Sequence, residues 1–153
     1  MQKVTPFLWF DDDLEDALRW YDGVMPDFRV LDESRTAGPE SPLFSARFSV
    51  GGQEFMAING GPDYRLTEAF SIMVVCDDQA EVDRYWGHLT DGGEEQPCGW
   101  LKDRFGVSWQ ITPRRLLELL GDPDPWRATR ARDAMLTMSR ISIADLEAAA
   151  AAG

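Results

Sequence analysis

The chain has 153 residues, of which 44% are hydrophobic and 27% charged, a composition typical of a globular domain with a hydrophobic core. Its formal net charge of −12 repels phosphate backbones and anionic lipid headgroups, so neither a nucleic acid nor a membrane is expected as a partner. No apolar run approaches the roughly 20 residues of a membrane-spanning helix. The N-terminal residues lack the pattern of a secretory signal. We therefore expect a cytoplasmic protein, and its arginine-rich set of basic residues suggests a bacterial source.

A repeat runs through the first three quarters of the chain. The segment Asp12–Tyr21 aligns with Asp77–Trp86, and each copy opens with a pair of aspartates suited to capping the start of a helix. An apolar run precedes each pair, Phe7–Phe10 in the first copy and Ile72–Val75 in the second. Such runs are typical of buried strands.

Further strands are predicted after each of these helices. The first helix is followed by candidates at Phe28–Glu33, Phe44–Val50 and Glu54–Asn59, with a tight turn at Gly51-Gly52. The second is followed by a short stretch near Glu94 and by Gly99–Asp103 and Val107–Thr112, with a turn at Asp103–Gly106. The predicted order is therefore βαβββ, twice.

After Pro113 the pattern becomes helical. A helix is predicted at Arg114–Leu120, a second begins after a cap at Asp124, and a third begins after a cap at Ser142. This tail is apolar enough that it must pack on the domain body or on a second copy of the chain. The apolar side chains concerned are Trp126, Met135, Leu136, Met138, Ile141, Ile143 and Leu146. We expect a homodimer, with a tail that folds back on a monomer as the alternative.

Three motifs, Ala57–Pro62, Val75–Asp83 and Cys98–Ile111, resemble the PhnB-like branch of the vicinal-oxygen-chelate superfamily, which includes glyoxalases, bleomycin-resistance proteins and dioxygenases. This branch is often labelled 3-demethylubiquinone-9 3-methyltransferase-like. The resemblance implies an α+β fold of two βαβββ modules that form curved mixed sheets around a cavity, plus C-terminal helices. A glyoxalase-like domain would span residues 1–113, with modules at about 1–61 and 68–113, and the helical extension would span 114–153.

The resemblance also implies where metal ligands would lie, on the first and last strands of each module. The equivalent positions here hold Pro6 and Met56 in the first module and Ser71 and Gln110 in the second. None is a His or Glu, and a thioether is a poor ligand for hard or borderline cations. We therefore expect no metal. No glycine-rich turn suits S-adenosylmethionine either, so no cofactor is predicted.

Two residues outside that set carry potential chemistry. His88, the single histidine, is placed on the second helix, where a surface position is more common than a catalytic one. Cys98 could be a nucleophile if Lys102 shared its strand face and lowered the pKa of its thiol, although a packed, unreactive thiol is the more common case. With Cys76 it makes a pair of cysteines expected to be free.

Several polar side chains fall on otherwise apolar strands. They could bond to each other, or they could line a small-molecule cavity with neighbouring apolar groups, and the sequence favours neither. The candidate cavity residues are Met56, Asn59, Ser71, Met73, Trp100, Ser108 and Gln110. Two functions follow: a metal-free homodimer that binds a small apolar or aromatic ligand, or a superfamily enzyme such as a lyase, dioxygenase or transferase. Convergence of Glu54, Glu68 or Glu94 on the cavity would favour the enzyme.

Overall fold

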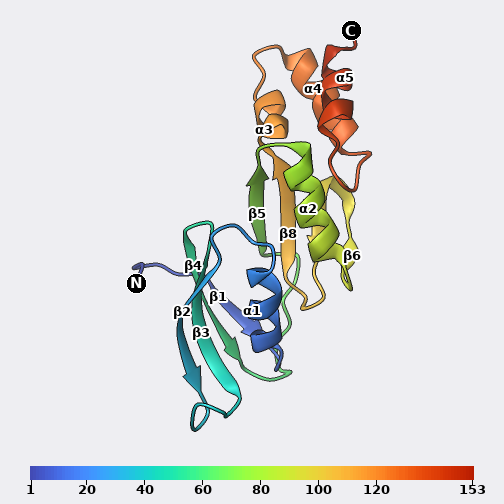
Figure 1. The fold of residues 1–153 in the computed structure, drawn as a ribbon. Helices are drawn as coiled ribbons and strands as arrows, with labels where there is room; N and C mark the ends of the chain where they lie inside the picture. The colour runs from blue at the N-terminus through green and yellow to red at the C-terminus, as the bar shows by residue number, and fades with distance from the viewer. The chain divides into compact units, whose positions relative to one another are not determined.

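The computed structural model describes residues 1–153 and divides the chain into two compact units, 1–66 and 67–153. Each unit contains one four-stranded mixed sheet with one helix against it, and the second unit also carries the C-terminal helices (Figure 1). No helix has both the length and the apolar character required to cross a membrane.

The first unit follows the predicted βαβββ order. Its elements are β1 (Phe7–Phe10), α1 (Leu14–Asp22), β2 (Arg29–Arg35), β3 (Leu43–Val50) and β4 (Gln53–Asn59). The strands are arranged β1-β4-β3-β2, with β1 parallel to β4 and the other pairs antiparallel. Both glycines of the predicted turn have positive φ, which lets β3 reverse directly into β4.

The second unit repeats this topology. Its elements are β5 (Ser71–Cys76), α2 (Gln79–Thr90), β6 (Glu94–Glu95), the 3₁₀ turn η1 (Pro97–Gly99), β7 (Trp100–Lys102) and β8 (Ser108–Pro113). The order β5-β8-β7-β6, with β5 parallel to β8, matches the first sheet strand for strand. The predicted fold of two βαβββ modules with C-terminal helices is confirmed. The predicted strand from Gly99 is shorter, because η1 takes its first residue.

The sheet face that packs on the helix forms the core of each module. In the second module Val74 and Cys76 of β5 and Trp109 and Ile111 of β8 are buried with Leu101 of β7. Because side chains alternate along a strand, the residues between them point to the other face. That open face carries the candidate site.

The two helix starts differ in how they are capped. The Asp78 side chain accepts a hydrogen bond from the Glu81 backbone N–H at 2.8 Å, as predicted for an N-cap. Asp13 makes no such bond. The Leu14 backbone N–H donates instead to Oδ1 of Asn59, at 3.0 Å, from the end of β4. The helix therefore begins where predicted, with Asp13 at the N-cap position, but the side-chain acceptor for its first turn comes from Asn59 of the sheet and not from Asp13.

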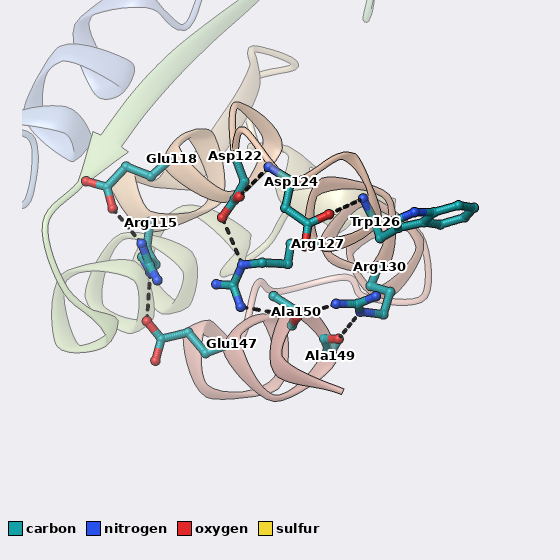
Figure 2. Close-up of polar contacts among 10 residues, drawn as sticks. All are labelled: Arg115, Glu118, Asp122, Asp124, Trp126, Arg127, Arg130, Glu147, Ala149 and Ala150. Carbon is teal, nitrogen blue, oxygen red and sulfur yellow. Dashed lines mark hydrogen bonds and ion pairs between the residues drawn. The ribbon is translucent and has the colours of Figure 1, made fainter. Parts of the chain in front are cut away.

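The tail forms a helical cluster, α3 (Arg114–Leu120), α4 (Pro125–Met135) and α5 (Ile143–Ala151). Its interior consists of buried apolar side chains: Leu116, Leu119, Ala131, Ile141, Leu146 and Ala150. Figure 2 shows that Arg130 of α4 donates to the carbonyl oxygens of Ala149 and Ala150 at the end of α5. The guanidinium supplies donors to carbonyls in the last turn of α5, where a positive charge also interacts favourably with the helix dipole.

The segment between α4 and α5 ties the cluster to its own module. The Cys98 and Gly99 backbone N–H groups donate to the carbonyls of Met138 and Ser139, each at 2.8 Å. Gln79 at the start of α2 donates to the carbonyl oxygen of Ile141, at 3.0 Å. The tail therefore packs on the domain body, as one of the two expected arrangements has it. Trp126 still points away from the cluster and is 72% exposed (Figure 2).

Ile141 is one of the fully buried side chains of the tail, so shortening this side chain should destabilise the protein. Ile141→Ala should lower the free energy of unfolding by about 3 kcal/mol, because it opens a cavity in the cluster and beside Gly99. Leu136→Ala, at a side chain that is 58% exposed, should change it by less than about 0.5 kcal/mol. Urea unfolding followed by circular dichroism measures both. Equal losses in the two variants would contradict the assignment of Ile141 to a packed interior.

Candidate functional site

The open face of the second sheet consists of two adjacent rows of side chains. Backbone pairing aligns Ser71, Ser108 and Lys102 across β5, β8 and β7 in the first row. The second row is aligned in the same way and comprises Met73, Gln110 and Trp100. Neighbouring strands lie about 4.8 Å apart, and residues two apart on one strand about 7 Å apart. All five candidates that the sequence analysis placed in this module therefore lie on one face.

The polar groups of this face differ in whether they have partners. Gln110 Nε2 donates a hydrogen bond to Ser71 Oγ at 2.9 Å, so these two satisfy each other. Ser108 lies between Ser71 and Lys102, is 1% exposed, and its Oγ has no hydrogen-bond partner within the protein. A buried hydroxyl without a partner costs about 1–3 kcal/mol. Ser108 is therefore the one group of this face whose bonding is incomplete.

Lys102 and Glu68 form an ion pair at the Lys102 end of the first row. Glu68 also accepts a hydrogen bond from Gln96 Nε2 at 3.2 Å. The hydrogen bond from Lys102, followed by those from the Glu68 backbone and Gln96, lowers the pKa of Glu68 to about 2. The hydrogen bond to Glu68 in turn raises the pKa of Lys102. Both groups are consequently charged throughout the neutral pH range.

Neither Lys102 nor Glu68 is among the cavity residues predicted from the sequence. Lys102 could have been found from strand alternation, since it is separated from Trp100 by one residue and therefore shares its face. Glu68 lies outside any strand, at the start of the second module, and no pattern in the sequence places it beside Lys102. Glu94 is the backbone partner of Lys102 on β6 and is exposed at the edge of the sheet.

The turn between β7 and β8 fixes the register of this face. The carboxylate of Asp103, a buried residue, accepts hydrogen bonds from the backbone N–H groups of Phe105 at 2.9 Å and Val107 at 3.0 Å. It also accepts one from Trp109 Nε1 at 2.8 Å. The turn places Lys102 directly opposite Ser108. The predicted turn at Asp103–Gly106 is thus confirmed, and the carboxylate holds it together.

The first module has an equivalent face with different chemistry. Met56 is aligned with Phe7 on β1 and Arg47 on β3, as Gln110 is with Met73 and Trp100. Arg47 pairs with Glu54 at 3.4 Å on the same face. A cavity of about 360 Å³ lies at the far end of this face, lined by Asp27, Arg29, Leu31, Ser49, Gly52 and Glu54. Met56 and Glu54 therefore share a face.

Asn59 lies on the opposite, helix-covered face of its sheet. Its side chain accepts from the Leu14 backbone N–H and donates to the Leu43 carbonyl oxygen at 2.9 Å. Both ends of the amide are thus committed to the fold, so we leave Asn59 out of the site.

The positions that would hold a metal carry no suitable ligands. Alternation along β1 places Pro6 on the same side as the buried Leu8, so the open-face position is Phe7 rather than Pro6. Phe7, Met56, Ser71 and Gln110 include no carboxylate, imidazole or thiolate. No group of three or more His, Cys, Asp or Glu side chains is arranged to hold a metal ion. The residues do not fit the metal that the superfamily fold implies.

The glycine pairs do not form a site for a methyl donor. A Cβ at Gly60 would lie 2.3 Å from the ring of Trp9, and one at Gly93 would lie 2.3 Å from the carbonyl oxygen of Lys102. Both glycines therefore allow close packing within the protein. Neither sheet has the doubly wound parallel order with which glycine-rich turns bind nucleotides.

Neither cysteine lies on the open face. Burial raises the pKa of the Cys76 thiol to about 12, so this thiol is protonated and unreactive at neutral pH. Cys98 is in η1 with a φ of 64°, outside β7. It therefore does not share a strand face with Lys102, and the route proposed for activating its thiol is wrong. His88 is half-buried on α2.

Comparison with known proteins assigns the chain to a family. The sequence profile of the family described as 3-demethylubiquinone-9 3-methyltransferase matches residues 2–112. The chain belongs to this family. The matched residues cover both modules and stop before the helical tail. The resemblance to the PhnB-like branch is confirmed by the PhnB protein of Bacillus cereus, whose structure matches with 31% identity and a TM-score of 0.66. That match covers 73% of this chain and 99% of the PhnB protein.

Two more distant structures show the same fold. Protein PA1353 of Pseudomonas aeruginosa matches with 23% identity and a TM-score of 0.59, over 74% of this chain and 98% of its own. The fosfomycin resistance protein FosX of Mesorhizobium loti matches with 21% identity and a TM-score of 0.58, over 80% and 99%. A sequence comparison with curated proteins found no match.

The Asp103 turn provides a test of how the open face is held. Asp103→Ala should lower the free energy of unfolding by about 3 kcal/mol or more, because it leaves three N–H donors without their acceptor. Asp63→Ala, at an exposed aspartate of the first unit, is the matched control and should have little effect. Chemical denaturation measures both. A loss no larger than that of the control would show that the carboxylate does not hold the turn.

Proposed function

We propose that this family member binds a small molecule without a metal, on the open face of its second sheet, as a homodimer. The observation that carries the proposal is the buried, unpartnered hydroxyl of Ser108. Ligand sites typically combine an apolar lining with a few placed polar groups. Met73 and Trp100 supply the apolar part here, and Ser108, Gln110 and Lys102 supply the polar part.

The alternative is an enzyme of the superfamily, a lyase, dioxygenase or transferase. Glu68 and Glu94 both approach Lys102, which is the kind of convergence that would favour it. A general base works best with a pKa near the operating pH. A carboxylate with a pKa of about 2 and a lysine with a raised pKa are poor proton-transfer groups. The charge state of this pair supports ionic binding rather than acid–base catalysis.

The dimer rests on the edge strands. β1 and β5 each form an outer edge of their sheet, and Phe7 on β1 is 57% exposed while Met73 on β5 is 49% exposed. Open edges with apolar side chains favour association with another chain. The tail gives less support than its sequence suggested, since Ile141 and Leu146 are buried within its own cluster.

Ser108 allows a test in which stability and binding change in opposite directions. Ser108→Ala should raise the free energy of unfolding of the free protein by about 1 kcal/mol, because it removes a buried hydroxyl that has no partner. It should also weaken the response of the Met73 methyl and Trp100 indole NMR signals to benzamide and benzyl alcohol. Ser71→Ala, which breaks a formed hydrogen bond, is the control and should destabilise the protein.

The result against the proposal is equally specific. If Ser108→Ala destabilises the protein as much as Ser71→Ala does, and no aromatic fragment shifts the Met73 or Trp100 signals of the wild type, the open face of the second sheet is not a binding site.

The dimer is tested by light scattering at micromolar protein concentration. The wild type should have the mass of two chains. Phe7→Glu should reduce it to one, because it puts a charge on the apolar edge, whereas Trp126→Glu in the tail should leave the dimer intact. A wild-type mass of one chain would exclude the homodimer, and dissociation by Trp126→Glu alone would move the interface to the tail.

A further inference from the structure

The burial of the Ser108 hydroxyl restricts how a ligand could bind to this group. At 1% exposure its Oγ is closed to solvent, so a neighbouring group must move before a ligand can bond to it. Lys102 is its backbone partner on β7, and Glu68 is the ion-pair partner of Lys102. The Glu68–Lys102 pair is therefore the charged group next to the hydroxyl.

Glu68 can leave this position more easily than the strand residues can. It belongs to the segment 67–70, outside any helix or strand, and its side chain is 46% exposed. Lys102 is fixed at the backbone by its pairing with Glu94 and Ser108. If Glu68 moves away, the half-buried ammonium of Lys102 loses its ion-pair partner, beside the Ser108 hydroxyl, which also lacks a partner. Both the Lys102 ammonium and the Ser108 hydroxyl can donate hydrogen bonds to a carboxylate, so a carboxylate carried by the ligand could replace that of Glu68.

We infer that the face binds a small aromatic or otherwise apolar carboxylic acid, and that Glu68 occupies the place of its carboxylate on Lys102 until the acid displaces it. The inference rests on the proposed function, because it names the ligand class for the same face. The carboxylate would accept hydrogen bonds from Lys102 Nζ and Ser108 Oγ in the first row. The apolar body would then extend about 7 Å onto the second row, over Met73, Gln110 and Trp100.

This arrangement makes Glu68 an internal competitor for the ligand. The binding of an acid must break the Glu68–Lys102 pair, which weakens the measured affinity by the cost of breaking it. A variant without the Glu68 carboxylate should therefore bind the acid more tightly than the wild type. A merely structural ion pair would not behave in this way, since its removal would weaken the site or leave it unchanged.

The experiment uses benzoate as the acid, benzamide as its neutral counterpart and acetate as a carboxylate without an apolar body. Calorimetry on the full chain should show benzoate binding in preference to the other two. Glu68→Gln should tighten benzoate binding about tenfold, the effect expected when a charge-assisted interaction no longer competes. Lys102→Met should weaken it about tenfold or more, and Lys102→Arg should retain it in large part.

Glu94→Gln is the matched control. It removes the same charge close to Lys102 but leaves the Glu68 ion pair intact, so benzoate affinity should change by less than about twofold. The comparison separates displacement of Glu68 from a general loss of negative charge. Circular dichroism of each variant confirms that it is folded before its binding is measured.

The outcomes distinguish the inference from the function on which it rests. Tighter benzoate binding in Glu68→Gln alone supports it. Equal tightening in Glu68→Gln and Glu94→Gln, or no tightening in either, overturns it. If benzamide binds the wild type as well as benzoate does and shifts the Met73 and Trp100 signals, the carboxylate class is wrong but the binding face stands. If neither compound shifts these signals in any variant, both proposals fail.

Discussion

The hydrogen bonds to the buried carboxylate of Asp103 set the geometry on which the candidate site depends. A buried charge is tolerated only when hydrogen bonds or ion partners compensate for lost hydration, and this carboxylate accepts bonds from two backbone N–H groups and an indole. These bonds define the turn between β7 and β8. A slip of one residue there would exchange the two faces of β8 and put Trp109 where Ser108 now lies. The register of the open face is thus inseparable from this turn.

The alternation of side chains along the strands gives each sheet one face that packs against a helix and a second face that the helix does not cover. The face that packs against the helix must be apolar, whereas the side chains of the other face are not constrained in this way. In the second module the row of Met73, Gln110 and Trp100 lies beside the row of Ser71, Ser108 and Lys102, and the hydroxyl of Ser108 has no partner. Fixed charge and hydrogen-bonding groups can supply the affinity that a metal would otherwise provide. The hydrogen bond from Lys102 to Glu68 raises the pKa of this lysine, which makes Lys102 a poor group for proton transfer at neutral pH.

The helical tail changes the second module without entering its open face. It contacts α2 through Gln79 and the turn before β7 through Cys98 and Gly99, and therefore holds the helix side of the module. The family match ends at residue 112, just before this tail. Its apolar residues divide into an inward set, which includes Ile141 and Leu146, and an exposed set, which includes Trp126 and Leu136. Only the second set is available to a partner.

The sequence by itself determined the repeat, the strand and helix order and the helix caps at Asp78, Asp124 and Ser142, because these depend on residues close together in the chain. It also placed Ser71, Met73, Trp100, Ser108 and Gln110 on strands of one sheet.

Only the tertiary structure decided the rest. Asn59 supplies the side-chain acceptor at the start of α1, in place of Asp13, because β4 ends beside that helix. Cys98 lies outside β7, where its backbone N–H bonds to the carbonyl of Met138. The pairing of Glu68 with Lys102 and the missing partner of Ser108 likewise depend on which atoms meet across the sheet. Such contacts between distant residues leave no periodic pattern in the sequence, which is why the fold could be predicted and the partner of Lys102 could not.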